Sequence, residues 1–170
     1  MTSVVDYRKM TIQLTPKPEL YNELAAELTS LLAGEHDLVA NAANFAALVF
    51  HSLPDLNWAG FYFVKDGELV LGPFQGKPAC MRITFGRGVC GAAAAKRATA
   101  IVPNVHEFPG HIACDMESNS EIVVPLMKDE RFIGVLDLDS PQLSRFDEDD
   151  AAGLETLATI LLASTGTDAS

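Results

Sequence analysis

A long loop at residues 106–120 carries the residues best suited to chemistry. It reads HEFPGHIACDMESNS and holds two histidines, several acids and Cys114. A connection of about 15 residues is longer than most in a compact domain, and long loops often hold functional side chains. Cys114 is therefore a candidate nucleophile. The competing interpretation is an inert packing cysteine, which is common for isolated cysteines.

Three acids on two neighbouring predicted strands form a second candidate group. Asp137 and Asp139 lie two residues apart, so a strand at 132–139 places both on one face. Glu121 begins the preceding predicted strand, and an even-sum register sets it opposite Asp137 or Asp139, whereas a slip of one residue sends it to the other face. Strand ends are often simply polar. If the three acids crowd together, however, repulsion and partial burial raise at least one pKa and keep a proton available near neutrality.

A thiol and a protonated carboxyl group together can reduce a bond between oxygen and another atom. The thiolate attacks the atom that bears the oxygen, and the acid protonates the departing oxygen. A second cysteine then resolves the oxidised thiol as a disulfide. Because nearby carboxylates disfavour a thiolate, Cys114 needs help from bound substrate, a helix end or His111.

Metal binding is an alternative use of the same loop. His106, His111 and Cys114 could bind zinc, with Cys80 or Cys90 completing a tetrahedral site. The spacings match no zinc-finger pattern, and three scattered cysteines in a reducing compartment predict no fixed disulfide framework. We expect no bound metal.

Aromatic residues cluster on the first predicted strand, 57–65. By alternation, Trp58 and Tyr62 share one face, and Phe61 and Phe63 share the other. These side chains are either core aromatics or, for Trp58 and Tyr62, a wall that packs on an apolar or methylthio group of a small ligand.

The rest of the sequence predicts the elements that position these residues. Prolines and apolar spacing indicate a helix at 16–32, and Asp37 can cap a second helix that runs to about residue 50. The Asp66-Gly67 pair predicts a type I′ hairpin. The remaining expected elements are strands at 80–85 and 98–105, a short helix at 92–96, a hairpin of 121–127 with 132–139, and a helix at 146–163. This order favours an α+β fold with a central antiparallel sheet flanked by helices. We expect one domain over 1–170, with 1–15 and 164–170 peripheral or loosely ordered.

Composition excludes several classes of function. Twelve Lys and Arg against 23 Asp and Glu give a net charge of −11, which repels phosphate backbones and anionic membranes. The first ten residues lack the apolar core of a signal peptide, and the longest uncharged stretch contains several polar residues. We therefore expect a cytoplasmic protein that binds neither nucleic acid nor a membrane.

Six segments carry a resemblance to a known family. They are NWAGFYFV (57–64), GPFQGKPAC (72–80), GRGVCG (86–91), VHEFPGHIACD (105–115), SNSEIVVP (118–125) and GVLDLDSP (134–141). They resemble the free methionine-(R)-sulfoxide reductases, stand-alone enzymes with a GAF-like fold, over essentially the whole chain. Asn104 departs from the pattern, because an acid is expected there.

The resemblance implies roles for the three cysteines. Cys114 would attack the sulfoxide sulfur and become a sulfenic acid. Cys80 would resolve it as a Cys80–Cys114 disulfide that thioredoxin reduces. Cys90 would lie beside the substrate as an auxiliary or alternative resolver. No cofactor is implied besides this external reductant.

The resemblance also implies a binding site for the free amino acid. Glu121, Asp137 and Asp139 would bind the sulfoxide and the amino group and supply the acid, while Trp58 and Tyr62 close the pocket around the methyl group. We expect the carboxylate to meet backbone amides near residues 88–91, at a helix start. The implied role is repair of oxidative damage, and homodimer formation is left open.

A GAF-type redox or small-ligand sensor without turnover is the alternative, because a fold does not fix a function. Residues 146–148 echo part of the signature of cyclic-nucleotide GAF domains, but the chain contains no Asn-Lys pair. A chain of 170 residues also leaves little room for the output domain of such modules.

Overall fold

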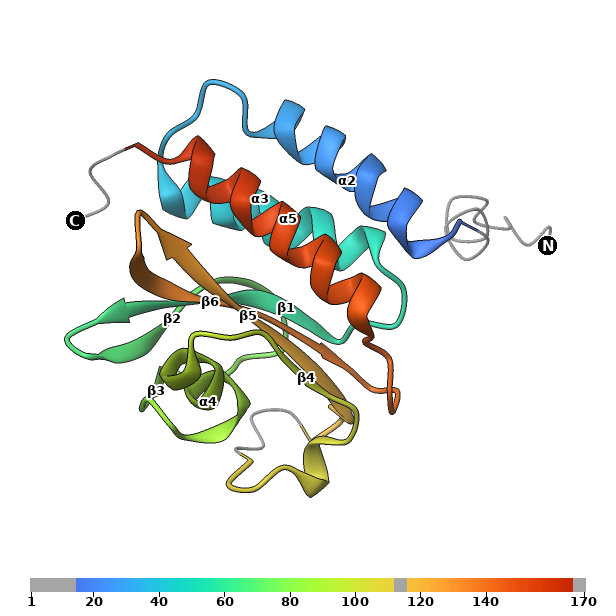
Figure 1. Cartoon of the computed structure of the whole chain (residues 1–170), viewed down its shortest axis with the longest axis vertical. Helices are drawn as coiled ribbons and strands as arrows, with labels where there is room; N and C mark the ends of the chain where they lie inside the picture. Colours follow the sequence, from blue (N-terminus) through green and yellow to red (C-terminus); the bar gives the residue numbers. More distant parts are fainter. Residues whose placement is uncertain (1–14, 112–115, 167–170) are drawn as a thin grey trace.

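A six-stranded antiparallel sheet with helices on both faces forms the centre of the structure (Figure 1). The computed structural model describes residues 15–111 and 116–166. The described elements are α2 (Lys17–Leu31), α3 (Leu38–Ser52), β1 (Trp58–Lys65), β2 (Glu68–Gly76), β3 (Arg82–Ile83), α4 (Gly88–Lys96), β4 (Ala100–Val102), a 3₁₀ helix (Val105–Glu107), β5 (Ser120–Lys128), β6 (Arg131–Ser140) and α5 (Glu148–Ser164).

The strands lie in the order β3-β2-β1-β6-β5-β4, and each neighbouring pair is antiparallel. Figure 1 shows α2, α3 and α5 on one face of the sheet and α4 on the other. The α+β prediction, with a central antiparallel sheet flanked by helices, is confirmed. The two faces of the sheet differ: long helices cover one, and the candidate site lies on the other.

The three-helix face forms the larger hydrophobic core. Phe61 and Phe63 of β1 point into it, together with Leu24 and Leu28 of α2 and Leu154 of α5. The predicted helix starts are confirmed: Pro16 precedes α2, and the Asp37 side chain accepts a hydrogen bond from the Ala40 amide at 2.8 Å. This side of the sheet is therefore structural. Because side chains alternate along a strand, burying one set in this core turns the other set toward the opposite face.

The hairpin from β1 to β2 has the predicted turn. Asp66 and Gly67 both have positive φ, 51° and 78°, which a type I′ turn requires. Next to the turn Lys65 pairs with Glu68, and a bulge between Gly60 and Tyr62 then shifts the register so that Trp58 pairs with Gly76. Trp58 and Tyr62 consequently face the α4 side, as alternation predicts.

Three of the expected elements have different bounds. The strand expected at 80–85 is reduced to β3, and the strand expected at 98–105 to β4, which ends at Val102 because Pro103 follows. The helix expected at 92–96 begins earlier, at Gly88. Gly91 makes this possible, since a Cβ there would lie 2.5 Å from the Thr84 carbonyl oxygen. The first turn of the helix can therefore pack closely against residues 84–86, the loop that leads into it.

The start of the long loop is a 3₁₀ turn. The Asn104 side chain accepts a hydrogen bond from the His106 amide at 3.1 Å. An aspartate would cap this turn in the same way, so the departure from the expected acid leaves the local structure intact. Residues 112–115, with Cys114, lie outside the described part.

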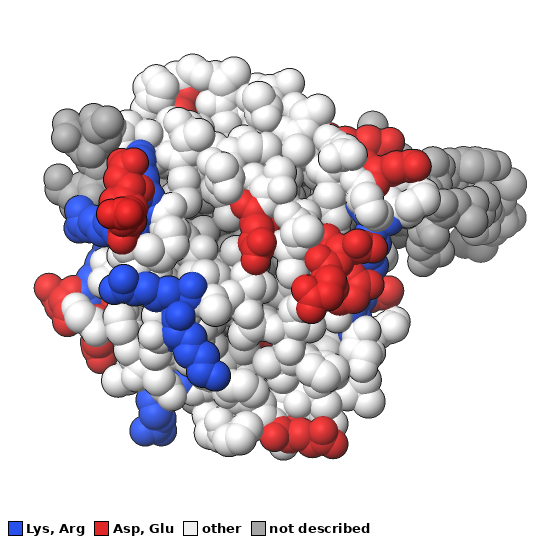
Figure 2. Space-filling view, in the orientation of Figure 1, with Lys and Arg blue, Asp and Glu red and all other residues white. Residues whose placement is uncertain are grey.

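None of the described helices combines the length and the apolar character that crossing a membrane requires. Figure 2 shows acidic and basic side chains in small separate groups on the face viewed, and the described residues there form no continuous basic surface. The expectation of peripheral termini falls mainly on residues outside the described ranges.

Candidate active site

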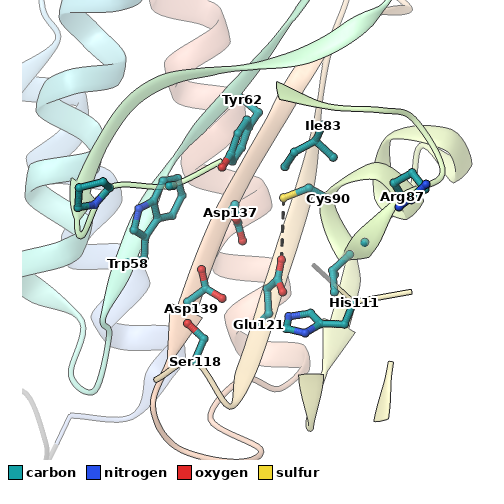
Figure 3. A pocket seen from close by; sticks show the side chains of 14 residues that line it. Trp58, Tyr62, Ile83, Arg87, Cys90, His111, Ser118, Glu121, Asp137 and Asp139 are labelled. Atoms are coloured by element: carbon teal, nitrogen blue, oxygen red, sulfur yellow. Dashed lines mark hydrogen bonds between the residues drawn. The ribbon is translucent and has the colours of Figure 1, made fainter. Parts of the chain in front are cut away.

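The register of β5 with β6 brings the three acids together. Glu121 pairs with Asp139, and Asp137 pairs with Val123 on β5 and with Gly60 on β1. The sum of 121 and 139 is even, so this is one of the two predicted pairings. All three carboxylates therefore point to the face that α4 covers (Figure 3).

Helix α4 adds a thiol to this group. Cys90 is buried, and its Sγ donates a hydrogen bond to Oε1 of Glu121 at 3.9 Å. One donor atom each from Cys90, Glu121 and Asp137 lies within 4.8 Å of the others. The resemblance placed Cys90 beside the substrate residues, and the structure places it beside the acids.

A pocket opens above this cluster. It is lined by Trp58, Tyr62, Pro78, Ala79, Ile83, Arg87, Gly88, Val89, Cys90, His111, Ser118, Glu121, Asp137 and Asp139. Six of the eight candidate residues are in this set. Cys80 follows directly on the lining residues Pro78 and Ala79 and is itself half-buried. The eighth, Cys114, lies outside the described residues, so its position and its pairing with Cys80 stay predictions.

Two aromatic rings form one wall of the pocket. Trp58 and Tyr62 stack with their ring centroids 5.9 Å apart, and Phe74 stacks on the other side of Trp58 at 5.3 Å. The indole N–H of Trp58 donates to the Lys77 carbonyl at 3.1 Å. Both rings are therefore core residues and pocket walls at once, and their orientation is fixed before a ligand binds.

Burial keeps protons on the acidic cluster. It raises the pKa of Glu121 well above the ordinary range, and the charges of Asp137 and Asp139 raise it further. Burial also raises the pKa of Asp137 to about 6, against the lowering effect of hydrogen bonds from Cys90 and Glu121. The pKa of Cys90 is raised by burial first and by the neighbouring carboxylates second. The cluster can thus hold a proton near neutral pH, as the sequence predicted.

The N-terminus of α4 forms the opposite side of the pocket. Gly88, Val89 and Cys90 line it, and the first turn of a helix leaves its backbone amides without acceptors in the helix. These amides and the positive end of the helix dipole favour a bound anion. Arg87, directly before the helix, adds a positive charge to the lining.

The sequence and the fold of this chain both match a known family. A profile of the GAF domain matches residues 18–163. The free methionine-R-sulfoxide reductase of Escherichia coli strain K12 is 51% identical over 85% of this chain and 88% of its own length. The crystal structure of the Neisseria meningitidis free methionine-R-sulfoxide reductase, in complex with its substrate, has a TM-score of 0.85 at 51% identity and covers 88% of this chain and 90% of that one.

The chain belongs to the free methionine-R-sulfoxide reductases. A yeast member, from Saccharomyces cerevisiae, is 44% identical over 85% of this chain and 85% of its own length. The resemblance found in the sequence is thereby confirmed, and so is the GAF-like fold. Membership in a family of oxidoreductases favours an enzyme over a sensor without turnover.

Some lining residues of this reductase were not found from the sequence. Arg87 and Ser118 lie in loops and Ile83 lies on the short strand β3, so no periodicity marks them as lining residues. The GRG segment before α4 was the available signal for Arg87. His111 was named as a source of help for the thiol and as a candidate zinc ligand; it lines the pocket, and burial and the nearby His106 lower its pKa.

The zinc alternative gains no support from the described part of the reductase. His106 Nε2 lies 2.8 Å from Oδ1 of Asn119 and is thus engaged within the loop. Among the described residues, the group with metal-binding spacing is Cys90, Glu121 and Asp137, which contains neither histidine.

Gly60 leaves the space that the aromatic wall requires, and its replacement tests the wall. A Cβ at Gly60 would lie 2.3 Å from Cβ of Phe74 and 2.7 Å from the Trp58 ring. We expect Gly60→Ala to lower the free energy of unfolding by about 1–3 kcal/mol and to weaken ligand binding. Urea unfolding and a binding titration measure the two effects. Gly166→Ala is the control, because a Cβ there has no atom within 4 Å; equal behaviour of the two variants would contradict the role of Gly60.

The raised pKa of Asp137 predicts a pH-dependent stability. In the folded chain the pKa of Asp137 is about 6, whereas the pKa of an aspartate in an unfolded chain is about 3.9. The folded state therefore binds more protons between these values, and the free energy of unfolding falls as the pH rises through them.

Asp137→Asn removes this ionisation. We expect the variant to be more stable than the parent at pH 8 by on the order of 1–3 kcal/mol, with a smaller difference at pH 4. Urea unfolding at both pH values measures this, and Asp129→Asn, at the exposed turn of the same hairpin, is the control. Identical pH dependence in the parent and in Asp137→Asn would contradict the burial of an ionisable carboxyl at this position.

Proposed function

We propose that this protein reduces free L-methionine (R)-sulfoxide to L-methionine with electrons from thioredoxin. The observation that carries the proposal is a cluster of three acids below an aromatic wall, in which burial raises the pKa of Glu121 well above its ordinary range, in a chain that belongs to a family of reductases for this substrate. We propose no bound cofactor, since cysteines perform the redox chemistry.

The pocket offers one partner for each group of the substrate. Trp58 and Tyr62 pack on the methyl group, and the carboxylate accepts hydrogen bonds from amides at the start of α4. Asp137 and Asp139 face the positive amino group. A sulfoxide inside a polypeptide lacks both free charges, so its binding would leave the buried acids and the helix terminus without partners.

The first chemical step transfers the sulfoxide oxygen from the substrate to a cysteine. The thiolate of Cys114 attacks the sulfoxide sulfur, and a protonated acid of the cluster, Glu121 or Asp139, donates its proton to the sulfoxide oxygen. The oxygen is transferred to Cys114, which becomes a sulfenic acid, and methionine leaves. Cys114 lies three residues after His111 and four before Ser118, and both of these line the pocket.

The second step restores the thiol. Cys80 attacks the sulfenic acid, which releases water and forms a disulfide with Cys114. The dithiol of thioredoxin then reduces this disulfide with two electrons and two protons. Cys90 is the alternative resolver, but its buried thiol and raised pKa make its thiolate scarce.

Cys80→Ser separates the two steps. We expect this variant to reduce one equivalent of sulfoxide per chain and to accumulate a sulfenic acid, while turnover with thioredoxin falls by about tenfold or more because Cys90 resolves slowly. Trapping with dimedone followed by mass spectrometry identifies the sulfenic acid. Unchanged steady-state turnover would contradict Cys80 as the resolver.

A coupled assay tests the proposed function. NADPH consumption through thioredoxin reductase and thioredoxin is followed with free methionine (R)-sulfoxide, its (S) epimer and a peptide-bound sulfoxide. We expect turnover with the free (R) form alone. Equal turnover of the peptide-bound form would overturn the assignment of the pocket, and no turnover of any form would favour the sensor.

A further inference from the structure

The floor of the pocket presents three side chains that could bind a metal ion and that form no ion pair with a described cation. Glu121 and Asp137 come from β5 and β6, and Cys90 comes from α4 (Figure 3). No ion pair joins any of the three to a described lysine, arginine or histidine. The protein attracts cations generally, because its net charge is −11.

One atom of this floor lacks a partner. Asp137 is only 6% exposed, and its buried Oδ1 accepts no hydrogen bond from a described residue. A buried oxygen without a partner costs free energy, which a suitable ligand recovers. Asp137 lines the pocket, so this oxygen is available to a cation that enters it.

The donor atoms suit a small divalent ion. The sulfur of Cys90 and one oxygen each from Glu121 and Asp137 lie within 4.8 Å of one another. Around a tetrahedral zinc ion, with bonds of about 2.0–2.3 Å, ligand atoms lie about 3.5 Å apart. The three side chains therefore need to close by little more than about 1 Å, which side-chain rotation supplies.

We propose that the reduced protein binds a zinc ion on Cys90, Glu121 and Asp137, with water as the fourth ligand. The ion displaces the protons of the Cys90 thiol and of the Glu121 carboxyl group to solvent and bonds to the thiolate and the carboxylates. A thiolate among few oxygens selects zinc or cobalt over magnesium and calcium, which need more oxygen ligands. The ion occupies the floor of the substrate pocket, so zinc inhibits reduction competitively; this last clause rests on the proposed function.

Cobalt absorption tests the site without reference to activity. The whole chain is reduced, freed of reductant under nitrogen and titrated with Co²⁺. We expect one ion per chain, a sulfur-to-cobalt charge-transfer band in the near ultraviolet, and loss of that band when Zn²⁺ but not Mg²⁺ is added. Absence of the band in the parent protein would overturn the proposal.

Variants identify the ligands. Cys90→Ser is expected to lose the band, and Asp137→Asn to raise the Kd for Co²⁺ by about tenfold or more. Asp129→Asn is the matched control, and the double variant Cys80→Ser/Cys114→Ser is expected to keep the band because its sulfur is that of Cys90. Circular dichroism checks each fold. A band that survives Cys90→Ser, or an unchanged Kd in Asp137→Asn, would overturn the ligand set.

The failure of this proposal and of the proposed function can be told apart. A cobalt band that depends on Cys90 supports the ion site even in a protein that turns over no sulfoxide. Absence of turnover in chelator-treated protein counts against the proposed function alone. Where turnover is present, added zinc is expected to raise the KM for methionine sulfoxide and leave kcat unchanged, and zinc-insensitive kinetics would overturn the inhibitory role.

Discussion

Cys114→Ser is expected to lower turnover of free methionine (R)-sulfoxide by about a thousandfold or more. A hydroxyl is not ionised near neutral pH and is a poor nucleophile toward sulfur, so the first bond between enzyme and substrate cannot form. The coupled thioredoxin assay measures the loss. Neither Cys80 nor Cys90 can replace Cys114, because the thiol of Cys90 has a raised pKa and Cys80 is needed to resolve the product.

The control for Cys114→Ser is substrate binding. The substitution changes none of the described lining residues, so the variant should bind methionine sulfoxide with nearly the affinity of the parent, as measured by calorimetry. Lost binding would indicate a folding defect rather than lost chemistry. A residual rate above about a tenth of that of the parent would reject Cys114 as the nucleophile.

Glu121→Gln and Asp139→Asn are each expected to lower kcat by about 10²–10⁴-fold. The amides keep the size of the side chains and cannot donate a proton to the departing oxygen. The fold should be retained, because the charge-free side chains are better suited to a buried position than carboxylates. Asp129→Asn, at the exposed turn of the same hairpin, should leave kcat unchanged.

The pH profile distinguishes chemistry from packing. The acid that donates must be protonated, so the rate of sulfoxide reduction should fall as the pH rises above its pKa, which burial places above the ordinary range for Glu121. Glu121→Gln should remove this fall of the rate at high pH. If Glu121→Gln lost activity together with its cooperative unfolding transition, a structural role would explain the result instead.

The hairpin that carries the acids could be predicted from the sequence because its strands and its turn depend on residues close together in the chain. The period of two in the strand fixes that Asp137 and Asp139 share a face. The register itself could not be predicted in this way. The turn pairs Lys128 with Arg131, and a regular ladder from there would set Glu121 opposite Leu138; a bulge between Leu126 and Met127 shifts the register by one residue and pairs Glu121 with Asp139. The same alternation predicted that Trp58 and Tyr62 share a face, and the structure places both in the pocket lining.

The position of α4 could not be predicted in this way. Its helix packs on β5 and β6, which lie about 30 to 50 residues further along the chain, and no local pattern reports such a contact. Cys90 was therefore joined to the acids only through the family resemblance. The alanines of 92–95 indicated a helix, but its true start depends on the close approach at Gly91, which is visible only in three dimensions.

Loop residues were the hardest to predict. Ser118 reaches the pocket because the Asn57 side chain donates to its hydroxyl at 3.0 Å, a contact between segments 61 residues apart. Lys77, which follows β2, forms an ion pair with Glu117 of the same loop. Loop side chains lack periodicity, so the sequence names the types of residues in such a loop and not the partners that position them.

A single-turnover measurement tests most directly whether the cysteines of this chain reduce the sulfoxide. Fully reduced protein, without any reductant, is mixed with an excess of racemic free methionine sulfoxide, and methionine and remaining thiols are counted. We expect one methionine per chain, formed from the (R) epimer only, with loss of two thiols, and a Cys80–Cys114 disulfide in the peptide map. No methionine, or methionine formed with all three thiols intact, would contradict reduction by the cysteines of this chain.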